Sequence, residues 1–351
     1  MKYGLLYLLL IIIAVIIVVI IFAYVGVDRI INKFWAVGLI GFLSYFFASL
    51  FVLLATTIGW WFILHSHNIK ASFLHATIGQ LIGTAISFIT PSMYIGGEPV
   101  KAHYIGSLYN TSKTKVFSTA VFAKFQELVS LLIFIYIGTL IMIIKAQQVQ
   151  LPAGIWTVLL VVDSILGVIV ILALRSVIRN SPIFSHLATW IAKRGILTKH
   201  IKKIIPKIIK TEELIYQAFK HDWKTGIVAF SFNFFSILIA FIKPIIFFYF
   251  LYHYNIFSLT EIAVIFTLSQ ILLVFQITPG CIGIFEGGQI GIFAIVGIGA
   301  VDAASYLLVY RFVDLIIIGT GLYLAIHYNL VRFVSARFET VDSSEKENNS
   351  Q

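Results

Sequence analysis

Long apolar stretches separated by short polar connections dominate the chain. Six of these stretches are long enough to cross a bilayer as helices, since about 20 residues span the hydrocarbon core. We expect the membrane spans at residues 4–25, 36–64, 116–144, 153–174, 226–252 and 303–326. Barrel strands alternate in polarity over about ten residues, so runs of this length indicate helices. The first span lacks the short apolar core and cleavage site of a signal peptide. The pattern predicts an all-α polytopic membrane protein.

Two further apolar segments are interrupted by helix-breaking residues. Residues 73–89 lead into the run TPSMYIGGEPVK, and residues 261–277 lead into TPGCIGIFEGG. From the end of the second run, a short helix is expected over residues 288–301. Backbone groups freed by such breaks inside a bilayer need partners within the protein or around a wet cavity. We expect each segment to form two short helices that turn back as a re-entrant pair; a single short span is the alternative. The residues that define the breaks are Thr90, Pro91, Gly96, Gly97, Pro99, Thr278, Pro279, Gly280 and Gly283.

The two interrupted segments share one layout. Their Thr-Pro prolines (279 − 91) and the glutamates that follow (286 − 98) are both 188 positions apart. In the next span, the cation (311 − 124) and the acid (314 − 127) are both 187 positions apart. Each unit holds three full spans, an odd number, so a second copy must lie upside down. The sequence therefore predicts an inverted repeat of residues 4–144 and 153–326 within one domain, 1–330, an organisation typical of transporters.

Composition agrees with this class and changes the meaning of the net charge. The chain is 60% hydrophobic and 11% charged, whereas soluble domains are about 25% charged. A net charge of +10 would indicate a nucleic-acid partner for a soluble protein. Here the cations lie in loops beside apolar spans, where they set topology. We therefore expect membrane lipids and no nucleic acid as partners.

Loop charges also predict an orientation in the cell membrane. Residues 175–224 carry eleven Lys and Arg against three acids, so we expect this basic loop on the cytoplasmic side. The polar tail, residues 331–351, is expected on the same side and to be disordered. This topology places Arg29 and Lys33 outside, against the positive-inside rule.

Ionisable side chains within the predicted membrane region are functional candidates by default. The candidate transport residues are Glu98, Lys101, Lys124, Glu127, Glu286, Arg311 and Asp314. Lys124 and Arg311 are expected to hold a lipid phosphate, and Lys101 to recruit it at the cytoplasmic mouth. The carboxylates would offset these cations or meet an ammonium head group. The structural alternative is that residues three apart pair along their own helix and that the glutamates only tie down broken backbone.

Enzyme motifs are absent from the sequence. It contains no His-Glu-x-x-His, Gly-x-Ser-x-Gly, P-loop or Asp-x-Asp pattern. The single cysteine, Cys281, permits no internal disulfide, and the histidines have no metal-ligand spacing. We expect no catalytic residue, metal or cofactor. The alternative is a membrane-embedded transferase or hydrolase with Glu98 or Glu286 as general base, or an accessory subunit of one.

These motifs resemble the lysylphosphatidylglycerol synthase transmembrane-region family, the flippase-like membrane domain of the multiple peptide resistance factor. The resemblance covers roughly residues 5–330 and rests on both interrupted runs and on the charged helices that follow them. It implies movement of an anionic phospholipid or a polyprenyl-phosphate-linked lipid between leaflets, with a lipid-modifying enzyme or glycosyltransferase as a candidate partner. The chain departs from the family pattern in Lys101 and Lys124, where Arg is common, and in Ala123, where an acid often stands. The aminoacyl-transfer domain is not expected here, so lysyl-lipid synthesis is not implied.

Overall fold

The computed structural model describes residues 16, 18–90, 96–145, 151–179, 182–194, 205–206, 208–210, 212–213, 216–217, 220, 223–274 and 278–330. These residues form helices and turns without any strand. Five of the described helices are long and apolar enough to cross a membrane: α2 (Val27–Ser66), α5 (Lys113–Ile144), α6 (Ala153–Arg179), α9 (Trp223–Tyr252) and α12 (Ala300–His327). The shorter elements are α3 (Phe73–Ile89), α4 (Glu98–Leu108), α7 (Ile183–Lys193), α10 (Leu259–Val274), the 3₁₀ turn η1 (Pro279–Cys281) and α11 (Ile284–Ile295).

The predicted all-α polytopic class is confirmed. Most of the predicted first span at 4–25, much of the basic loop at 175–224 and the tail at 331–351 lie outside the described residues. The long helices match the remaining predicted spans within a few residues, except α2. The polar connection expected between the first two spans is wrong at this point, because α2 already begins at Val27 and runs through it. Its interruption comes later, at Gly38 (φ 70°, ψ 170°), a conformation open to glycine.

The first interrupted segment folds back on itself. Ser72 caps α3 by accepting a hydrogen bond from the backbone N–H of His75. At the other end of the pair, Tyr109 follows α4, and its hydroxyl lies 2.7 Å from Nδ1 of His75 and accepts the N–H of Ser72 at 2.7 Å. The beginning of α3 therefore meets the end of α4. Residues 73–108 therefore form two short helices that turn back on each other, as predicted; their re-entrant position in a membrane stays a prediction.

The second interrupted segment also folds back. Phe257, before α10, and Phe293, near the end of α11, both pack on Phe248 of α9, with ring centroids 5.1 and 5.2 Å apart. Between the two helices, Gly280 (φ 59°) and Gly283 (φ 86°) make a left-handed turn that suits glycine. The expected start of the second helix at Gly288 is wrong. Helix α11 begins at Ile284, because the side chain of Glu286 bonds the N–H of Gly283 and caps the helix there.

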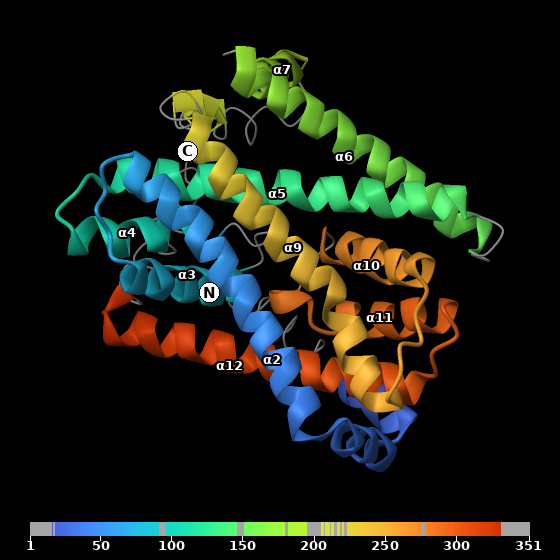
Figure 1. The fold of residues 1–351 in the computed structure, drawn as a ribbon. Coiled ribbons are helices and arrows are strands. Elements are labelled where there is room, and N and C mark those ends of the chain that lie inside the picture. The colour runs from blue at the N-terminus through green and yellow to red at the C-terminus, as the bar shows by residue number, and fades with distance from the viewer. Residues whose placement is uncertain are drawn as a thin grey trace, which may run out of the picture.

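The two hairpins approach from opposite ends of α12. In the first hairpin, Tyr104 of α4 packs on Tyr328, just after the end of α12, at 4.8 Å between ring centroids. In the second, Phe293 packs on Tyr306 near the start of α12 at 5.1 Å. The hairpins therefore open toward opposite ends of α12, and their tips point inward (Figure 1).

Glycines allow close packing between the two halves of the chain. Helices α2 and α9 lie side by side (Figure 1) and antiparallel. A Cβ added at Gly41 would lie 2.7 Å from Phe250, and one at Gly59 would lie 3.0 Å from the carbonyl oxygen of Ala229. Helix α3 packs along α12, and α10 along α5. If the two halves are exchanged, the α2–α9 contact maps onto itself and the α3–α12 contact maps onto the α10–α5 contact. An inverted repeat requires such a correspondence; the repeat itself stays a prediction.

Each hairpin has its own hydrophobic core. Trp60, Ile82 and Ile105 are fully buried around the first hairpin. Phe247 and Phe293 are fully buried around the second. Helix α6 contacts α5 and α7 at the edge of the molecule (Figure 1). The packed centre of the protein therefore consists of the two hairpins and the four long helices α2, α5, α9 and α12.

The first hairpin has a steric requirement for Gly97. An alanine Cβ there would lie 1.9 Å from the carbonyl oxygen of Gly83, although the φ of −87° suits alanine. We expect Gly97→Ala to destabilise the protein by about 2 kcal/mol or more, since backbone cannot yield as a side chain does. Gly291→Ala in α11 is the control, because a Cβ there meets nothing within 4 Å. Thermal unfolding in detergent checks this; equal midpoints for the two variants would contradict the contact.

Candidate functional site

Glu98 and Lys101 lie inside the first hairpin. Glu98 is the first residue of α4, with Pro99 next to it, and its side chain is 5% exposed. Lys101 follows one turn later and is 6% exposed. Its ammonium donates a hydrogen bond to Oε1 of Gln80 at 2.6 Å and lies 4.1 Å from a ring centroid of Trp60, a cation–π distance. Lys101 is therefore buried, not at an open mouth as predicted.

Helix α5 adds a second ion pair beside this hairpin. Nζ of Lys124 lies 3.0 Å from Oε1 of Glu127, with the side chains 17% and 31% exposed. Glu98 interacts electrostatically with both Lys101 and Lys124. Oε2 of Glu98 is buried, yet it accepts no hydrogen bond within the part of the chain that the structure describes. The first cluster therefore keeps one acceptor unused beside two cations.

Glu286 and Arg311 form the centre of the second cluster. Glu286 is 2% exposed, and its two carboxylate oxygens accept different donors. Oε2 accepts the backbone N–H of Gly283 at 2.6 Å, and Oε1 accepts Nε of Arg311 at 2.5 Å. Nη1 of Arg311 donates to the carbonyl oxygen of Gly280 at 3.1 Å. These bonds satisfy the broken backbone at the hairpin tip, as the structural alternative expects.

Asp314 and Lys243 complete the second cluster. Oδ2 of Asp314 lies 3.9 Å from Nη1 of Arg311. Asp314 also interacts electrostatically with Lys243 of α9, whose ammonium stands 4.7 Å from the ring of Tyr45 and 5.2 Å from that of Tyr310. Nη2 of Arg311 is buried and donates no hydrogen bond to any described residue. The second cluster thus keeps one donor unused.

The two hairpins meet at the end of α3. The hydroxyl of Ser87 accepts the N–H of Gly97 at 2.8 Å and so holds the tip of the first hairpin. The next side chain, Phe88, lies against the tip of the second: a Cβ at Gly280 would be 2.1 Å from its ring, and the ring centroid is 6.0 Å from the guanidinium carbon of Arg311. Two consecutive residues of α3 therefore contact both interrupted motifs.

The threonines of the two motifs make comparable local bonds. The hydroxyl of Thr90 donates to the carbonyl oxygen of Ile86, and that of Thr278 donates to the carbonyl oxygen of Ile282, each at 2.9 Å. Gly96 lies in the turn before α4. Pro91 lies outside the described residues, and Pro279 opens η1.

Several residues of the two clusters were not among the predicted site residues. Lys243 carried a signal, since it is an ionisable residue in the middle of an apolar span. No comparable signal marked the polar and aromatic residues of the clusters, because such residues are frequent along these helices. They are Gln80, Trp60, Phe88 and Tyr310. Their role depends on which helices pack together.

The geometry makes Glu286 the weaker of the two candidate general bases, since Oε2 of Glu98 accepts no hydrogen bond from a described residue. Both oxygens of Glu286 already accept hydrogen bonds from protein donors, so it has little capacity left as a general base. In the described part of the chain, no group of three or more His, Cys, Asp or Glu side chains could hold a metal ion. The arrangement is one of paired charges, suited to holding a charged group.

The Glu286–Arg311 pair is testable by a double-mutant cycle. We expect Glu286→Gln and Arg311→Gln each to lower the free energy of unfolding. The loss in the double variant should be about 1–3 kcal/mol smaller than the sum of the two single losses, because the two side chains bond each other. The matched control is the pair Lys124 and Glu127, which lies on one helix and should couple by only about 0.5 kcal/mol. Thermal unfolding in detergent measures both cycles; equal coupling in the two would contradict this difference.

Comparison with known proteins places the chain in a family. A family model described as the lysylphosphatidylglycerol synthase TM region matches residues 7–320. A UPF0104 membrane protein of Methanocaldococcus jannaschii is 31% identical over 114 residues, which cover 32% of this chain and 34% of the relative. The match thus spans about a third of that relative. No solved structure matches the chain.

The family model covers both interrupted motifs and both charged helices, so the predicted resemblance is confirmed on the residues that carry it. The chain is a multi-pass membrane protein that belongs to the lysylphosphatidylglycerol synthase TM-region family.

Proposed function

We propose that the protein moves an anionic phospholipid or a polyprenyl-phosphate-linked lipid between the two leaflets of the cytoplasmic membrane. Membership of a family named for a lipid synthase supports a lipid-related role. The observation that carries the proposal is the meeting of two oppositely directed, charged hairpins at Ser87 and Phe88. Interrupted helices that converge within the bilayer are typical of transporter binding sites.

The unused hydrogen-bonding atoms support binding of a polar head group. Nη2 of Arg311 is a buried donor without a partner among the described residues. A guanidinium with free N–H groups suits a phosphate oxygen. A buried donor left unsatisfied costs the protein about 1–3 kcal/mol. A ligand that accepts a hydrogen bond from this donor removes that cost, which favours its binding.

The charge balance supports transient rather than tight binding. The first cluster has two cations and two carboxylates, and the second has the same when Lys243 is included. A phosphate that enters must compete with the carboxylates for the cations. Competition of this kind limits affinity, and a transported lipid must also leave.

The hairpins offer separate routes to the two membrane faces. The first opens near the end of α12, at Tyr328, and the second near its start, at Tyr306. In this proposal the segment 175–224 and the chain's end face the cytoplasm, and a lipid-modifying enzyme or glycosyltransferase supplies or consumes the lipid.

A proteoliposome assay tests translocation. Liposomes with fluorophore-labelled phosphatidylglycerol in both leaflets are exposed to a membrane-impermeant reductant. The reductant bleaches a lipid of the inner leaflet only after that lipid has moved to the outer leaflet. We expect faster bleaching than in empty liposomes. With Arg311→Lys we expect the bleaching rate to be at least tenfold slower, because lysine keeps the positive charge but lacks the planar guanidinium that binds a phosphate through two N–H groups. Lys70→Gln, an exposed site between α2 and α3, is the control. Bleaching no faster than in empty liposomes would rule the function out.

A charge exchange separates lipid contact from helix pairing. Lys124→Glu combined with Glu127→Lys retains an ion pair three residues apart on α5. If pairing is the only role, the exchanged protein transports normally. We expect it to unfold at the wild-type temperature but to transport at least tenfold more slowly, because the cation has moved away from Glu98. Wild-type transport by the exchanged variant would assign this pair a structural role only.

A further inference from the structure

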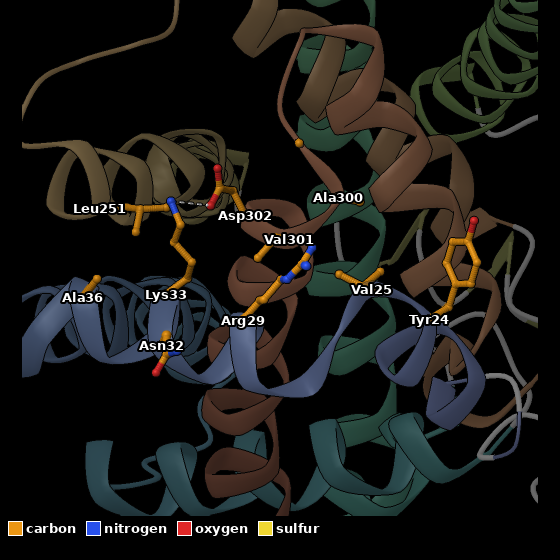
Figure 2. Close-up of a pocket in the computed structure, with 11 residues that line it drawn as sticks. Tyr24, Val25, Arg29, Asn32, Lys33, Ala36, Leu251, Ala300, Val301 and Asp302 are labelled. Atoms are coloured by element: carbon orange, nitrogen blue, oxygen red, sulfur yellow. Dashed lines mark ion pairs between the residues drawn. The ribbon is translucent and has the colours of Figure 1, made fainter.

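An open hollow lies where the ends of three membrane-spanning helices meet, apart from the charged hairpins. Its volume is about 880 Å³, within the range of small-molecule sites. The lining comes from the helical residues just before α2, the first turns of α2, the end of α9 and the start of α12 (Figure 2): Tyr24, Val25, Arg29, Asn32, Lys33, Ala36, Leu251, Gly299, Ala300, Val301 and Asp302. The walls are mostly apolar, and two of the lining residues are cations.

The two cations stand on the same side of α2. Arg29 and Lys33 are four residues apart, one helical turn, and Figure 2 shows both side chains rising from α2 toward the start of α12. Arg29 has no ion pair with any residue that the structure describes. A cation beside a hollow that pairs with none of the described residues is available to a ligand.

The second cation is only partly neutralised. Nζ of Lys33 lies 3.0 Å from Oδ1 of Asp302, and the Lys33 side chain is 41% exposed. Asp302 is fixed in turn, because the hydroxyl of Tyr252 donates a hydrogen bond to its Oδ2. With two cations and one carboxylate, the hollow carries a net positive charge, which the uncapped start of α12 at Gly299 increases.

The surroundings point to a lipid rather than a soluble anion. Three helices long enough to cross the membrane begin or end here, so the hollow lies at the membrane–water boundary. Around it, Tyr24 is 92% exposed, Trp35 72% and Tyr254 62%. Exposed Trp and Tyr side chains are enriched at this boundary. Acyl chains beside these rings would place a phosphate at the height of Arg29.

The position also explains an exception to the expected topology. Arg29 and Lys33 lie beside Leu251, at the opposite end of α9 from Trp223, which belongs to the last residues of the basic segment 175–224. Cations on that face run against the positive-inside rule. A binding role accounts for their presence where topology disfavours them.

We propose that this hollow binds the phosphate of an anionic membrane lipid between Arg29 and Lys33, with Asp302 weakening the interaction. The inference concerns binding at the membrane surface and does not depend on translocation. Loss of binding with unchanged transport would therefore leave the proposed function standing, and the reverse result would leave this site standing.

Native mass spectrometry of the full-length protein in detergent tests the proposal. Dioleoyl phosphatidylglycerol is titrated, with the zwitterionic phosphatidylcholine as the comparison lipid. We expect the double variant Arg29→Gln/Lys33→Gln to bind phosphatidylglycerol about tenfold more weakly, with phosphatidylcholine unchanged, because charge-assisted hydrogen bonds are lost. Lys70→Gln, which also removes one exposed cation, should bind as the wild type does. Equal binding by the double variant and the control would overturn the proposal.

A second variant works in the opposite direction. Asp302→Asn removes the negative charge but keeps an oxygen for the hydroxyl of Tyr252, so we expect several-fold tighter phosphatidylglycerol binding. Unchanged binding by this variant, when its thermal unfolding matches the wild type, would count against the site. Inorganic phosphate at the same concentration should not displace the lipid; displacement would show a site for free anions and overturn the lipid assignment.

Discussion

Backbone groups released within the bilayer must be bonded by the protein, and this constraint governs the centre of the molecule. The hydrocarbon core of a bilayer offers no water as a hydrogen-bond partner, and an unsatisfied peptide group costs several kcal/mol. The tip of the first hairpin is held by Ser87, which accepts the N–H of Gly97. The tip of the second is held by Glu286 and Arg311, which bond Gly283 and Gly280. The side chains that make the broken helices stable therefore also bring charged groups to the place where the two hairpins meet.

The two halves meet this constraint with different chemistry. The first hairpin uses a neutral hydroxyl, so the carboxylate of Glu98 is left with an unused oxygen. The second commits both oxygens of Glu286 and two nitrogens of Arg311, and only Nη2 is left. The carboxylate of the second hairpin is thus the more fully hydrogen-bonded of the two glutamates. In the proposed transport cycle, it provides the fixed binding group, while the first cluster has more capacity to exchange partners.

The charged hairpins and the hollow at Arg29 and Lys33 differ in their charge balance and in their exposure to solvent. The hairpin clusters balance their charges internally, which keeps ionised groups tolerable in a low-dielectric region. The hollow at Arg29 and Lys33 carries excess positive charge and lies where water and head groups are present. In the two proposals, affinity for an anion is therefore stronger at the hollow, where desolvation costs less, than at the hairpin clusters.

The sequence by itself determined the class of protein, because apolar runs of this length can fold only as membrane helices. It also located both helix breaks, since Pro, Gly and ionisable residues stand out against an apolar background, and the hairpins formed where they were predicted. Local capping decided the start of α11 at Ile284, a detail that the Gly287–Gly288 pair obscured. Only the tertiary structure brought Phe88 onto Arg311, Lys243 toward Asp314 and Gln80 onto Lys101. Those contacts join helices far apart along the chain, and spacing within one helix carries no information about which other helix will pack against it.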